Sequence, residues 1–341
     1  MQAVILAGGY GTRLAPLTYT KAKPMLPLLN KPMICYIIDA LPSGTEIIVA
    51  SNYRNDEIEE YFEENGINAI INNEPQPLGT GGAVKYAEKY IDGTFLVLNS
   101  DIISSLNFRK FIQYHMKKEA IVTISLWPVK NVEEFGVVDI LSDGRIRKFV
   151  EKPSKEQAPS NLINAGAYCM EYEVLDYISP NKFVSMEMDI FPKIIDDGKP
   201  FYGYTFNGYW IDVGRFLSYI EATKILLKEK GLKYLVGENC RVSGVLKTST
   251  LGNNCEVGKN ALVKNCIVYD NCKIGENVEM ENCIIAENCV IEENVRLKDV
   301  VVGEEERIEK NAIIENKKIW SKPLPEGYPK KQIGNPLKRR K

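Results

Sequence analysis

The sequence predicts an α/β domain built on a mostly parallel sheet, followed by a left-handed parallel β-helix. The length of 341 residues exceeds what one hydrophobic core usually supports, so two domains are expected. Over residues 1–230, short apolar runs alternate with amphipathic stretches. Beyond that point the sequence acquires a 17-residue repeat.

The first part of the chain has the pattern of βαβ units. The strand-like runs are AVILA, EIIVAS, FLVLNS and AIVTISLWPV, and the helix-like stretches are residues 32–41, 56–65 and 80–90. This alternation predicts helices packed on a largely parallel sheet, with ligands bound outside the carboxyl ends of the strands. Residues 215–230 have helical periodicity and are followed by Gly231, so we expect them to form the helix that closes this domain.

The repeat becomes visible when the segments 254–270, 271–287 and 288–304 are aligned. Apolar residues recur roughly every six positions, and Gly or Asn occupies the corners, where these residues tolerate a left-handed backbone. A period of this kind predicts a solenoid in which each coil buries its face on the next. The six-residue turns predict that this solenoid is left-handed.

Six of the eight cysteines lie between Cys240 and Cys289, in and just before this repeat. Cys255, Cys272 and Cys289 are 17 residues apart, as are Cys266 and Cys283. We expect these side chains to form inward-facing ladders of small buried groups. A metal site is the alternative interpretation, and it is disfavoured because no CxxC pair occurs and no histidine is nearby.

We therefore divide the chain into an α/β domain at 1–230, a β-helix at 231–316 and a proline-rich basic tail at 317–341. We expect the tail to cover the end of the solenoid and its KRRK end to be solvated.

The bulk composition argues against several classes of function. The formal net charge of -2 provides no basic field for nucleic acid, and no stretch approaches the length of a membrane-spanning helix. The opening MQAVILAGG has no basic flank and indicates a buried strand rather than a signal peptide, so we expect a cytoplasmic protein. The only histidine, His115, lies in a stretch that resembles a polar helix face, and we expect no catalytic role for it.

The clearest chemical signal is LAGGYGTRLAPLT at 6–18, a glycine-rich loop directly after the first predicted strand. Backbone N–H groups of such a loop can surround phosphate oxygens, because glycine lets the chain approach closely. Arg13 adds a planar fork of donors and Lys23 a second positive charge. The loop has neither the GK[ST] ending of a P-loop nor the spacing of a dinucleotide fingerprint.

The wider run LAGGYGTRLAPLTYTKAKPMLP resembles the signature of the sugar-1-phosphate nucleotidyltransferases, a GGxGTRLxPLT run followed by PKPxxP. Ala22 stands where the family commonly has proline, and Lys23 keeps its position. The resemblance covers nearly the whole chain. It implies a Rossmann-like nucleotidyltransferase domain, to which a left-handed β-helix is commonly appended, and it implies a nucleoside triphosphate, a sugar 1-phosphate and Mg²⁺ as ligands.

The resemblance also implies roles for individual residues. Asp101, which ends FLVLNSD, and Asp212, in GYWIDVG, would hold Mg²⁺, a hard ion that prefers oxygen ligands. The implied catalytic cations are Arg13, Lys23 and Lys152. The implied nucleotide-binding residues are Leu6, Ala7, Gly8, Gly9, Gly11, Thr12, Arg13, Glu74, Gly79 and Thr80. The implied sugar-binding residues are Gly136, Glu151, Lys152, Asn164 and Glu187.

The implied reaction is an in-line attack, in which an oxygen of the sugar phosphate attacks the α-phosphorus and pyrophosphate leaves. It needs no covalent intermediate and no general base, because the nucleophile is already ionised. The task of the protein would be positioning and charge neutralisation.

One carboxylate bears on the choice of base. Within NEPQPLGTGG, Glu74 occupies the position five residues before the first loop glycine, where uridylyl and thymidylyl members usually have glutamine. Guanine offers two adjacent donors that a carboxylate matches, whereas uracil and thymine flank one donor with acceptors. This favours GTP, and PLGTGGA, SMEMDIFP and GYWIDVG resemble the mannose-1-phosphate guanylyltransferase branch and its heptose-phosphate relatives. A shift of register would make Gln76 the base reader and favour UTP or dTTP.

Three other functional interpretations either stay open or are disfavoured by the sequence. The chain could use glucose 1-phosphate, since the sugar is read by three-dimensional placement of groups such as Glu151 and Asn164. A non-catalytic regulatory subunit is disfavoured because Arg13, Lys23, Asp101 and Asp212 are all present. An acyltransferase is disfavoured because the β-helix contains no histidine. We expect the β-helix to serve assembly and to produce a homo-oligomer.

Overall fold

The computed structural model describes residues 1–329, so the KRRK end of the predicted tail lies outside the described residues. The chain forms two compact units. The first contains Met1–Gly9 and Tyr36–Trp210, and the second contains Tyr10–Cys35 and the described residues from Ile211 onward. The glycine-rich signature therefore begins in the first unit and continues in the second.

The first unit is built on a nine-stranded sheet with the order β10-β9-β11-β6-β1-β4-β5, with β8 beside β11 and β12 beside β8. Its strands are β1 (Gln2–Leu6), β4 (Glu46–Ser51), β5 (Ala69–Asn73), β6 (Phe95–Asn99), β8 (Val122–Pro128), β9 (Gly136–Ile140), β10 (Ile146–Glu151), β11 (Leu162–Met170) and β12 (Phe201–Thr205). Strand β1 pairs in parallel with β4 and β6, and β4 pairs in parallel with β5. Strand β11 is antiparallel to β6 and β8. The four predicted strands are thus confirmed as β1, β4, β6 and β8.

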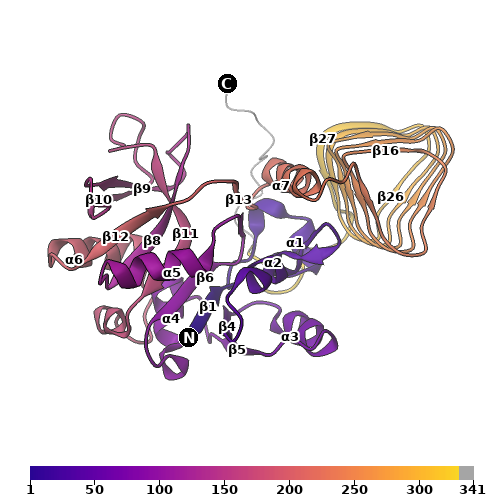
Figure 1. Cartoon of the computed structure of the whole chain (residues 1–341). Coiled ribbons are helices and arrows are strands. Elements are labelled where there is room, and N and C mark those ends of the chain that lie inside the picture. Colours follow the sequence, from indigo (N-terminus) through magenta and orange to yellow (C-terminus); the bar gives the residue numbers. More distant parts are fainter. Residues whose placement is uncertain (330–341) are drawn as a thin grey trace. The chain divides into compact units, whose positions relative to one another are not determined.

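Helices cover both faces of this sheet (Figure 1). They are α2 (Met33–Ala40), α3 (Asn55–Glu64), α4 (Gly79–Tyr86), α5 (Phe108–Lys117) and α6 (Phe191–Asp196), with shorter turns η3 (Glu88–Tyr90), η4 (Tyr172–Tyr177) and η5 (Met186–Ile190). Side chains of α4, η5 and α6 share one apolar cluster with Val4, Val97 and Ile124. The predicted helices at 32–41, 56–65 and 80–90 are confirmed with small changes of boundary.

The expectation that His115 lies on a polar helix face is wrong. His115 is fully buried on α5, with Nδ1 2.9 Å from Thr123 Oγ1 and Nε2 3.0 Å from Glu171 Oε1. Its buried neighbours on the helix are Phe108 and Phe111, so the apolar stripe runs at spacings of three and four residues and reaches the histidine. Burial lowers the pKa of His115, and the nearby Glu171 carboxylate offsets part of that effect.

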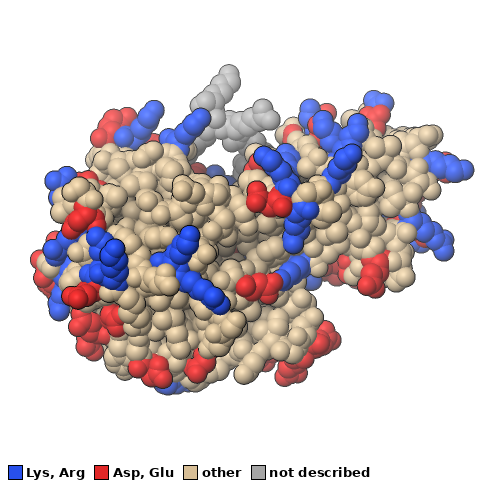
Figure 2. Space-filling view, viewed as in Figure 1, with Lys and Arg blue, Asp and Glu red and all other residues tan. Residues whose placement is uncertain are grey.

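The second unit contains the signature segment, a closing helix and the solenoid. Its first elements are η1 (Thr12–Leu14), α1 (Leu17–Thr20), η2 (Lys23–Met25), β2 (Pro27–Leu28) and β3 (Lys31–Pro32). The strand β13 (Trp210–Asp212) precedes α7 (Phe216–Glu229), which confirms the helix predicted at 215–230. Acidic and basic side chains are interspersed on the face drawn in Figure 2, as the small net charge predicts. No helix among residues 1–329 is long and apolar enough to cross a membrane.

The solenoid is the predicted left-handed parallel β-helix, drawn end-on as a triangle in Figure 1. One face holds β14 (Leu235–Val236), β17 (Thr250–Leu251), β20 (Ile267–Val268) and β23 (Ile284–Ile285). A second holds β15 (Arg241–Val242), β18 (Glu256–Val257), β21 (Lys273–Ile274), β24 (Val290–Ile291) and β26 (Arg307–Ile308). The third holds β16 (Val245–Lys247), β19 (Leu262–Lys264) and β22 (Glu279–Glu281), while β25 (Arg296–Val302) and β27 (Ile313–Ile319) each turn a corner.

The cysteine ladders are confirmed as part of the core of this solenoid. Cys255, Cys272 and Cys289 are completely buried, as are Cys266 and Cys283. All eight cysteines are free thiols. The Sγ atoms of Cys255, Cys272 and Cys289 each donate to a carbonyl 14 residues further on, at 3.1, 3.0 and 3.0 Å. The ladders therefore satisfy backbone acceptors as well as filling the core.

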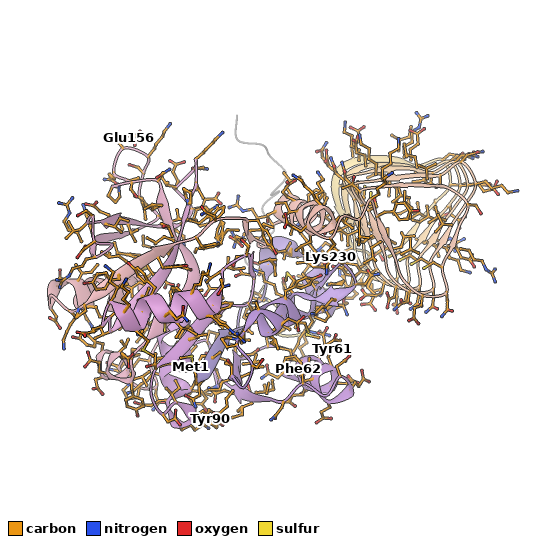
Figure 3. The ribbon with its side chains drawn as sticks, in the orientation of Figure 1. Met1, Tyr61, Phe62, Tyr90, Glu156 and Lys230 are labelled. Atoms are coloured by element: carbon orange, nitrogen blue, oxygen red, sulfur yellow. The ribbon has the colours of Figure 1, made fainter. Side chains whose placement is uncertain are left out.

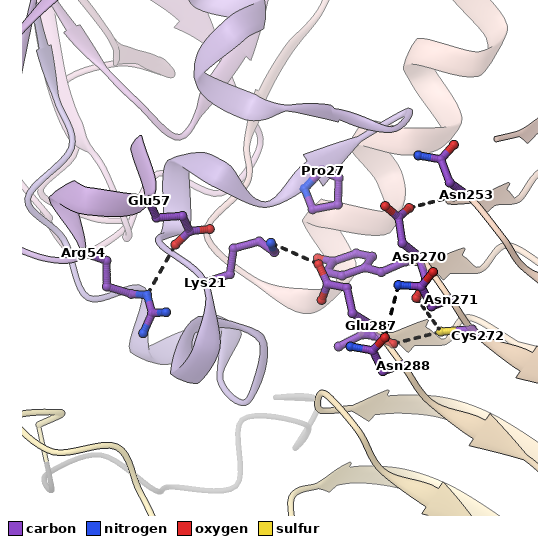
Figure 4. Close-up of polar contacts among 12 residues, drawn as sticks. Lys21, Pro27, Arg54, Glu57, Asn253, Asp270, Asn271, Cys272, Glu287 and Asn288 are labelled. Carbon is purple, nitrogen blue, oxygen red and sulfur yellow. Dashed lines mark hydrogen bonds and ion pairs between the residues drawn. The ribbon is translucent and has the colours of Figure 1, made fainter. Parts of the chain in front are cut away.

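Asparagines form ladders at the corners, and Asn277 tests how they act. Asn277 has a φ of 58°, accepts from Asn260 Nδ2 at 3.1 Å and donates to Asn294 Oδ1 at 3.1 Å (Figure 4 shows the equivalent pair Asn271 and Asn288). We expect Asn277→Ala to lower the free energy of unfolding by about 2 kcal/mol, because alanine pays the left-handed penalty and both ladder bonds are lost. Urea unfolding would measure this, and Asn277→Gly should recover the backbone part. Equal losses in both variants would contradict a backbone contribution.

Candidate active site

The first glycines of the signature follow the carboxyl end of β1. Ala7 N donates to Ala50 O at 2.8 Å, and Ser100 N donates to Leu6 O at 3.1 Å, so both neighbouring strands hold the chain up to this point. A Cβ placed on Gly9 would meet no atom of the described chain within 4 Å. The predicted nucleotide-binding residues Leu6, Ala7, Gly8 and Gly9 therefore end in backbone with an open side.

Two polar side chains lie beside Gly8. A Cβ on Gly8 would lie 3.4 Å from Asn52 Oδ1 and 3.7 Å from Glu74 Oε1. Glu74 is 6% exposed, and its Oε2 accepts a hydrogen bond from Leu78 N at 3.3 Å. Burial raises the pKa of Glu74, while the bond from Leu78 N opposes that shift. By contrast, Gln76 is exposed, so Glu74 is the side chain of this loop that faces the glycine backbone.

A second cluster joins several predicted sugar-binding residues. Asn164 Nδ2 donates to Tyr168 OH at 2.9 Å, and Tyr168 OH donates to Glu187 Oε1 at 3.2 Å. Glu187 Oε2 accepts from Thr80 Oγ1 at 2.7 Å and from Ser185 Oγ at 2.8 Å. Thr80, which the sequence assigned to the nucleotide, thus contacts the sugar-pocket carboxylate Glu187, and Gly79 begins the same helix, α4.

Glu151 and Lys152 lie at the end of β10, beside Gly136 at the start of β9. Strands β9 and β10 pair Glu151 with Gly136, where a Cβ on the glycine would lie 2.9 Å from Glu151 Oε2. Lys152 Nζ is 3.3 Å from Glu151 Oε1. Burial raises the pKa of Glu151, Lys152 opposes this shift, and the negative charge of Glu187 adds to it. The carboxylates of Glu151 and Glu187 are therefore close enough to interact. The loop that follows carries Glu156 at its outer end (Figure 3).

In the second unit, Arg13 and Asp212 both approach the side-chain position of one glycine. A Cβ on Gly214 would be 2.7 Å from Asp212 Oδ1 and 3.0 Å from Arg13 Nη2. The predicted cation and the predicted metal ligand therefore share one small space in which only a glycine fits.

Lys23 is held against the turn of the signature loop. It is 9% exposed, and its Cβ would be 3.2 Å from a Cβ on Gly11, which has a φ of 63°. Thr18 also contacts this side of Gly11, at 2.7 Å from the same position. A side chain at this glycine would therefore face backbone strain and a steric clash together. Thr12 follows as the first residue of η1.

Each of the two predicted metal ligands lies at, or two residues beyond, the end of a strand. Asp101 lies between β6 and β7 (Ile102–Ser104), directly beyond the carboxyl end of β6, and Asp212 is the last residue of β13. Within residues 1–329 no group of three or more His, Cys, Asp and Glu side chains is placed to hold a metal ion. Two carboxylates suit Mg²⁺ only if other oxygens complete its coordination, which fits an ion that usually retains waters and binds substrate phosphates.

Sequence reasoning missed two side chains of these clusters, those of Tyr168 and Asn52, and one glycine, Gly214. Tyr168 connects Asn164 with Glu187, but a tyrosine within an apolar strand reads as core. Asn52 follows β4 just as the glycine loop follows β1, and this position at the carboxyl end of a parallel strand was the available signal. Gly214 stands two residues after Asp212 in WIDVG, where the glycine could have been read as a close approach.

Two family models match the chain. Residues 2–229 match the model described as Nucleotidyl transferase, and residues 233–333 match the GMPPB C-terminal domain. Mannose-1-phosphate guanyltransferase 2 of Candida glabrata is 37% identical over 239 residues, which cover 67% of this chain and 65% of the relative. The probable mannose-1-phosphate guanylyltransferase 3 of Oryza sativa subsp. japonica is 36% identical over 286 residues, covering 79% of this chain and 78% of the relative.

The chain is also similar to a relative named for a different base and to a protein of known crystal structure. The UTP–glucose-1-phosphate uridylyltransferase of Synechocystis sp. is 30% identical over 321 residues, covering 79% of this chain and 83% of the relative. The crystal structure of HddC from Yersinia pseudotuberculosis complexed with GMP-PN is 31% identical with a TM-score of 0.56, covering 66% of this chain and 99% of that chain. Because the nucleotidyl transferase model spans residues 2–229 and the relative from Oryza sativa is 36% identical over 79% of the chain, the chain belongs to the sugar-1-phosphate nucleotidyltransferase family.

Proposed function

We propose that this protein transfers a guanylyl group from GTP to mannose 1-phosphate, giving GDP-mannose and pyrophosphate. The observation that carries the choice of base is the buried Glu74 carboxylate beside Gly8. An ionised carboxylate accepts the two adjacent donors of guanine, N1–H and the exocyclic amine. The names of the relatives from Candida glabrata and Oryza sativa support the same reaction.

The reaction needs charge neutralisation more than proton transfer. We assign Arg13 and Lys23 to the triphosphate, and Lys152 to the sugar phosphate. The N–H groups of Gly8, Gly9, Gly11 and Thr12 would surround phosphate oxygens, as glycine-rich backbone after a strand does elsewhere. Holding both anions in line and lowering their repulsion accounts for catalysis without a general base.

Members of this family generally use a divalent metal. We propose Mg²⁺ for this chain, held by Asp101 and Asp212 together with phosphate oxygens. When bound, such an ion neutralises developing charge on the phosphate oxygens. The residues of the chain would orient the phosphates, and Asp212 would also fix the guanidinium of Arg13 beside Gly214.

The sugar would be bound by the cluster around Tyr168. Glu151 and Glu187 present carboxylate oxygens to sugar hydroxyls, Asn164 presents its side chain, and Gly136 lets the sugar approach the backbone. Tyr168 and Thr80 hold the Glu187 carboxylate through both of its oxygens, so its orientation is preset. Preset acceptors of this kind discriminate among sugars that differ in one hydroxyl.

Several wider features belong to the same proposal. We assign 1–230 to catalysis, 231–316 to the β-helix and 317–341 to a tail, and we propose that the β-helix mediates homo-oligomer formation. The free thiols support a reducing compartment, and we propose a cytoplasmic location.

A panel of triphosphates tests the proposal. GTP, UTP, dTTP and ATP would each be paired with mannose 1-phosphate and glucose 1-phosphate, with Mg²⁺ present, and scored by pyrophosphate release. The expected result is the highest rate for GTP with mannose 1-phosphate. Inactivity with every pair would remove the enzymatic proposal. A preference for UTP with glucose 1-phosphate would instead support the alternative that the Synechocystis relative suggests.

Glu74→Gln tests the assignment of the base. We expect it to lower kcat/KM for GTP by about 10–100-fold, because the variant loses one charge-assisted bond and presents a donor to guanine N1–H or its amine. The same variant should raise kcat/KM for UTP, since glutamine both donates and accepts. Gln76→Glu is the matched control and should leave both values within about twofold, because Gln76 is exposed. Unchanged discrimination in Glu74→Gln would contradict the assignment.

A further inference from the structure

The last described residues return to the glycine-rich signature within the second unit. After β27 ends at Ile319, the chain carries Trp320 and Tyr328 against the segment that contains Tyr10 and Tyr19. We call residues 318–328 the C-terminal strap. It belongs to the same compact unit as Tyr10–Cys35.

The strap contacts the phosphate loop at and near its backbone carbonyls. Tyr328 OH is 3.0 Å from Thr18 Oγ1 and donates to Tyr10 O at 3.4 Å. Thr18 Oγ1 in turn donates to Gly11 O at 3.0 Å. Beside them, Lys318 Nζ donates to Arg13 O at 2.9 Å. The strap thus bonds the carbonyls of Tyr10 and Arg13 directly. It reaches the carbonyl of Gly11 only through Thr18, and that carbonyl also accepts from Leu14 N at 2.8 Å.

This orientation has a direct consequence for the N–H groups of the loop. Each peptide unit is planar and trans, so its N–H points opposite to its carbonyl. Fixing the carbonyls of Tyr10 and Gly11 therefore turns the N–H groups of Gly11 and Thr12 away from the strap. Those N–H groups are the ones assigned to phosphate oxygens above.

Aromatic packing holds the strap in place. The Tyr328 ring lies edge-on to Tyr19 with centroids 4.8 Å apart, and the Trp320 ring is 5.2 Å from Tyr19. Trp320 also covers the last coil, where a Cβ on Gly303 would lie 2.5 Å from its ring. Tyr328 is 6% exposed. The strap is therefore a packed element and not a loose end.

The rest of the signature segment rests on the solenoid as well. Lys21 Nζ is 3.1 Å from Glu287 Oε1 (Figure 4), and Asn30 Nδ2 donates to Leu251 O at 2.6 Å. These contacts anchor the segment on either side of Lys23. The signature segment thus contacts the β-helix, and the strap packs against residues 10–19 of the same segment.

We infer that the C-terminal strap positions the phosphate loop for the triphosphate, with Tyr328 and Lys318 acting as positioning residues. This inference rests on the proposed function, because it assigns the loop to the triphosphate. The residues act through the loop backbone and touch no reacting group. Loss of their hydrogen bonds affects the triphosphate and leaves the sugar phosphate site, built on β9, β10 and β11, unchanged.

The test compares Tyr328→Phe, Lys318→Met and the double variant in the full chain. Each single variant should raise KM for the most active triphosphate about fivefold, the size of one lost hydrogen bond, and the double variant by more than either. KM for the sugar phosphate should stay within about twofold. Lys322→Met is the matched control, because this strap lysine pairs with Glu305 of the β-helix and not with the loop. Hydrogen exchange at Leu14 and Ala15, whose N–H groups donate to Gly11 O and Thr12 O, should be faster in Tyr328→Phe than in the control.

The outcomes separate this inference from the proposed function. If the wild-type chain is inactive with every triphosphate, the proposed function fails, and faster exchange at Leu14 and Ala15 still decides whether the strap orders the loop. If the double variant loses thermal stability but keeps KM for the triphosphate and the exchange of the loop, the strap is only structural and the inference is overturned. Equal effects in Lys322→Met would overturn it too.

Discussion

Arg13→Ala should lower kcat/KM for the triphosphate by about 10²–10³-fold, the cost of removing one preorganised donor from a site of developing charge. The guanidinium lies in a confined space. A Cβ on Gly214 would lie 3.0 Å from Arg13 Nη2 and 2.7 Å from Asp212 Oδ1. Arg13→Lys should recover only part of the loss, because lysine keeps the charge but not the planar fork. Pyrophosphate release at saturating sugar phosphate measures the effect.

Gly214→Ala provides a companion test in which no charged group is removed. The added methyl would have to displace Asp212 or Arg13, so we expect kcat to fall by about tenfold or more, as misplacement by an ångström commonly costs. Gly93→Ala is the matched control, because a Cβ there meets nothing within 4 Å. Near-normal kcat in Arg13→Ala would remove Arg13 from the proposed machinery. Equal activity in both glycine variants would show that the close approach at Gly214 has no role in catalysis.

The architecture could be predicted because its patterns are local. The four apolar strands and the 17-residue repeat can each be recognised within a short stretch of sequence, and the structure confirms them. The prediction for His115 was wrong because histidine was counted as polar, although its spacing from Phe108 and Phe111 places it on the apolar stripe of α5. Position along a helix was better evidence than residue type.

The contacts of the site could be predicted only as far as motifs extend. Thr80 and Glu187 each stand in a recognisable motif, but nothing in the sequence indicates that they are hydrogen-bonded across 107 positions. The contact of Tyr328 with Thr18 spans 310 positions and joins a tail without a motif to the signature. Such contacts depend on where the closing elements of the fold bring the chain, which short-range periodicity does not encode.

Lys152→Ala should lower kcat/KM for the sugar phosphate by about 10²–10³-fold, because the phosphate of the nucleophile would lose its neutralising cation beside a second anion. The Lys152 side chain is 64% exposed, and its Nζ lies 3.3 Å from Glu151 Oε1. Removing Lys152 would also leave the half-buried Glu151 carboxylate without that counter-charge, which raises the pKa of Glu151 further. Lys152→Arg should retain more activity than Lys152→Ala, and KM for the triphosphate should change little in either.

The backbone at Lys152 makes a sharper version of this test possible. Lys152 has a φ of 46°, in the left-handed region, and its N–H donates to Phe135 O at 3.0 Å. A glycine there would avoid a backbone cost of about 1–2 kcal/mol, so Lys152→Gly should be as inactive as Lys152→Ala yet melt at a higher temperature. Lys152→Gly with near-normal kcat/KM for the sugar phosphate would contradict the role of Lys152, and equal melting temperatures for the alanine and glycine variants would show that the left-handed backbone stores no strain.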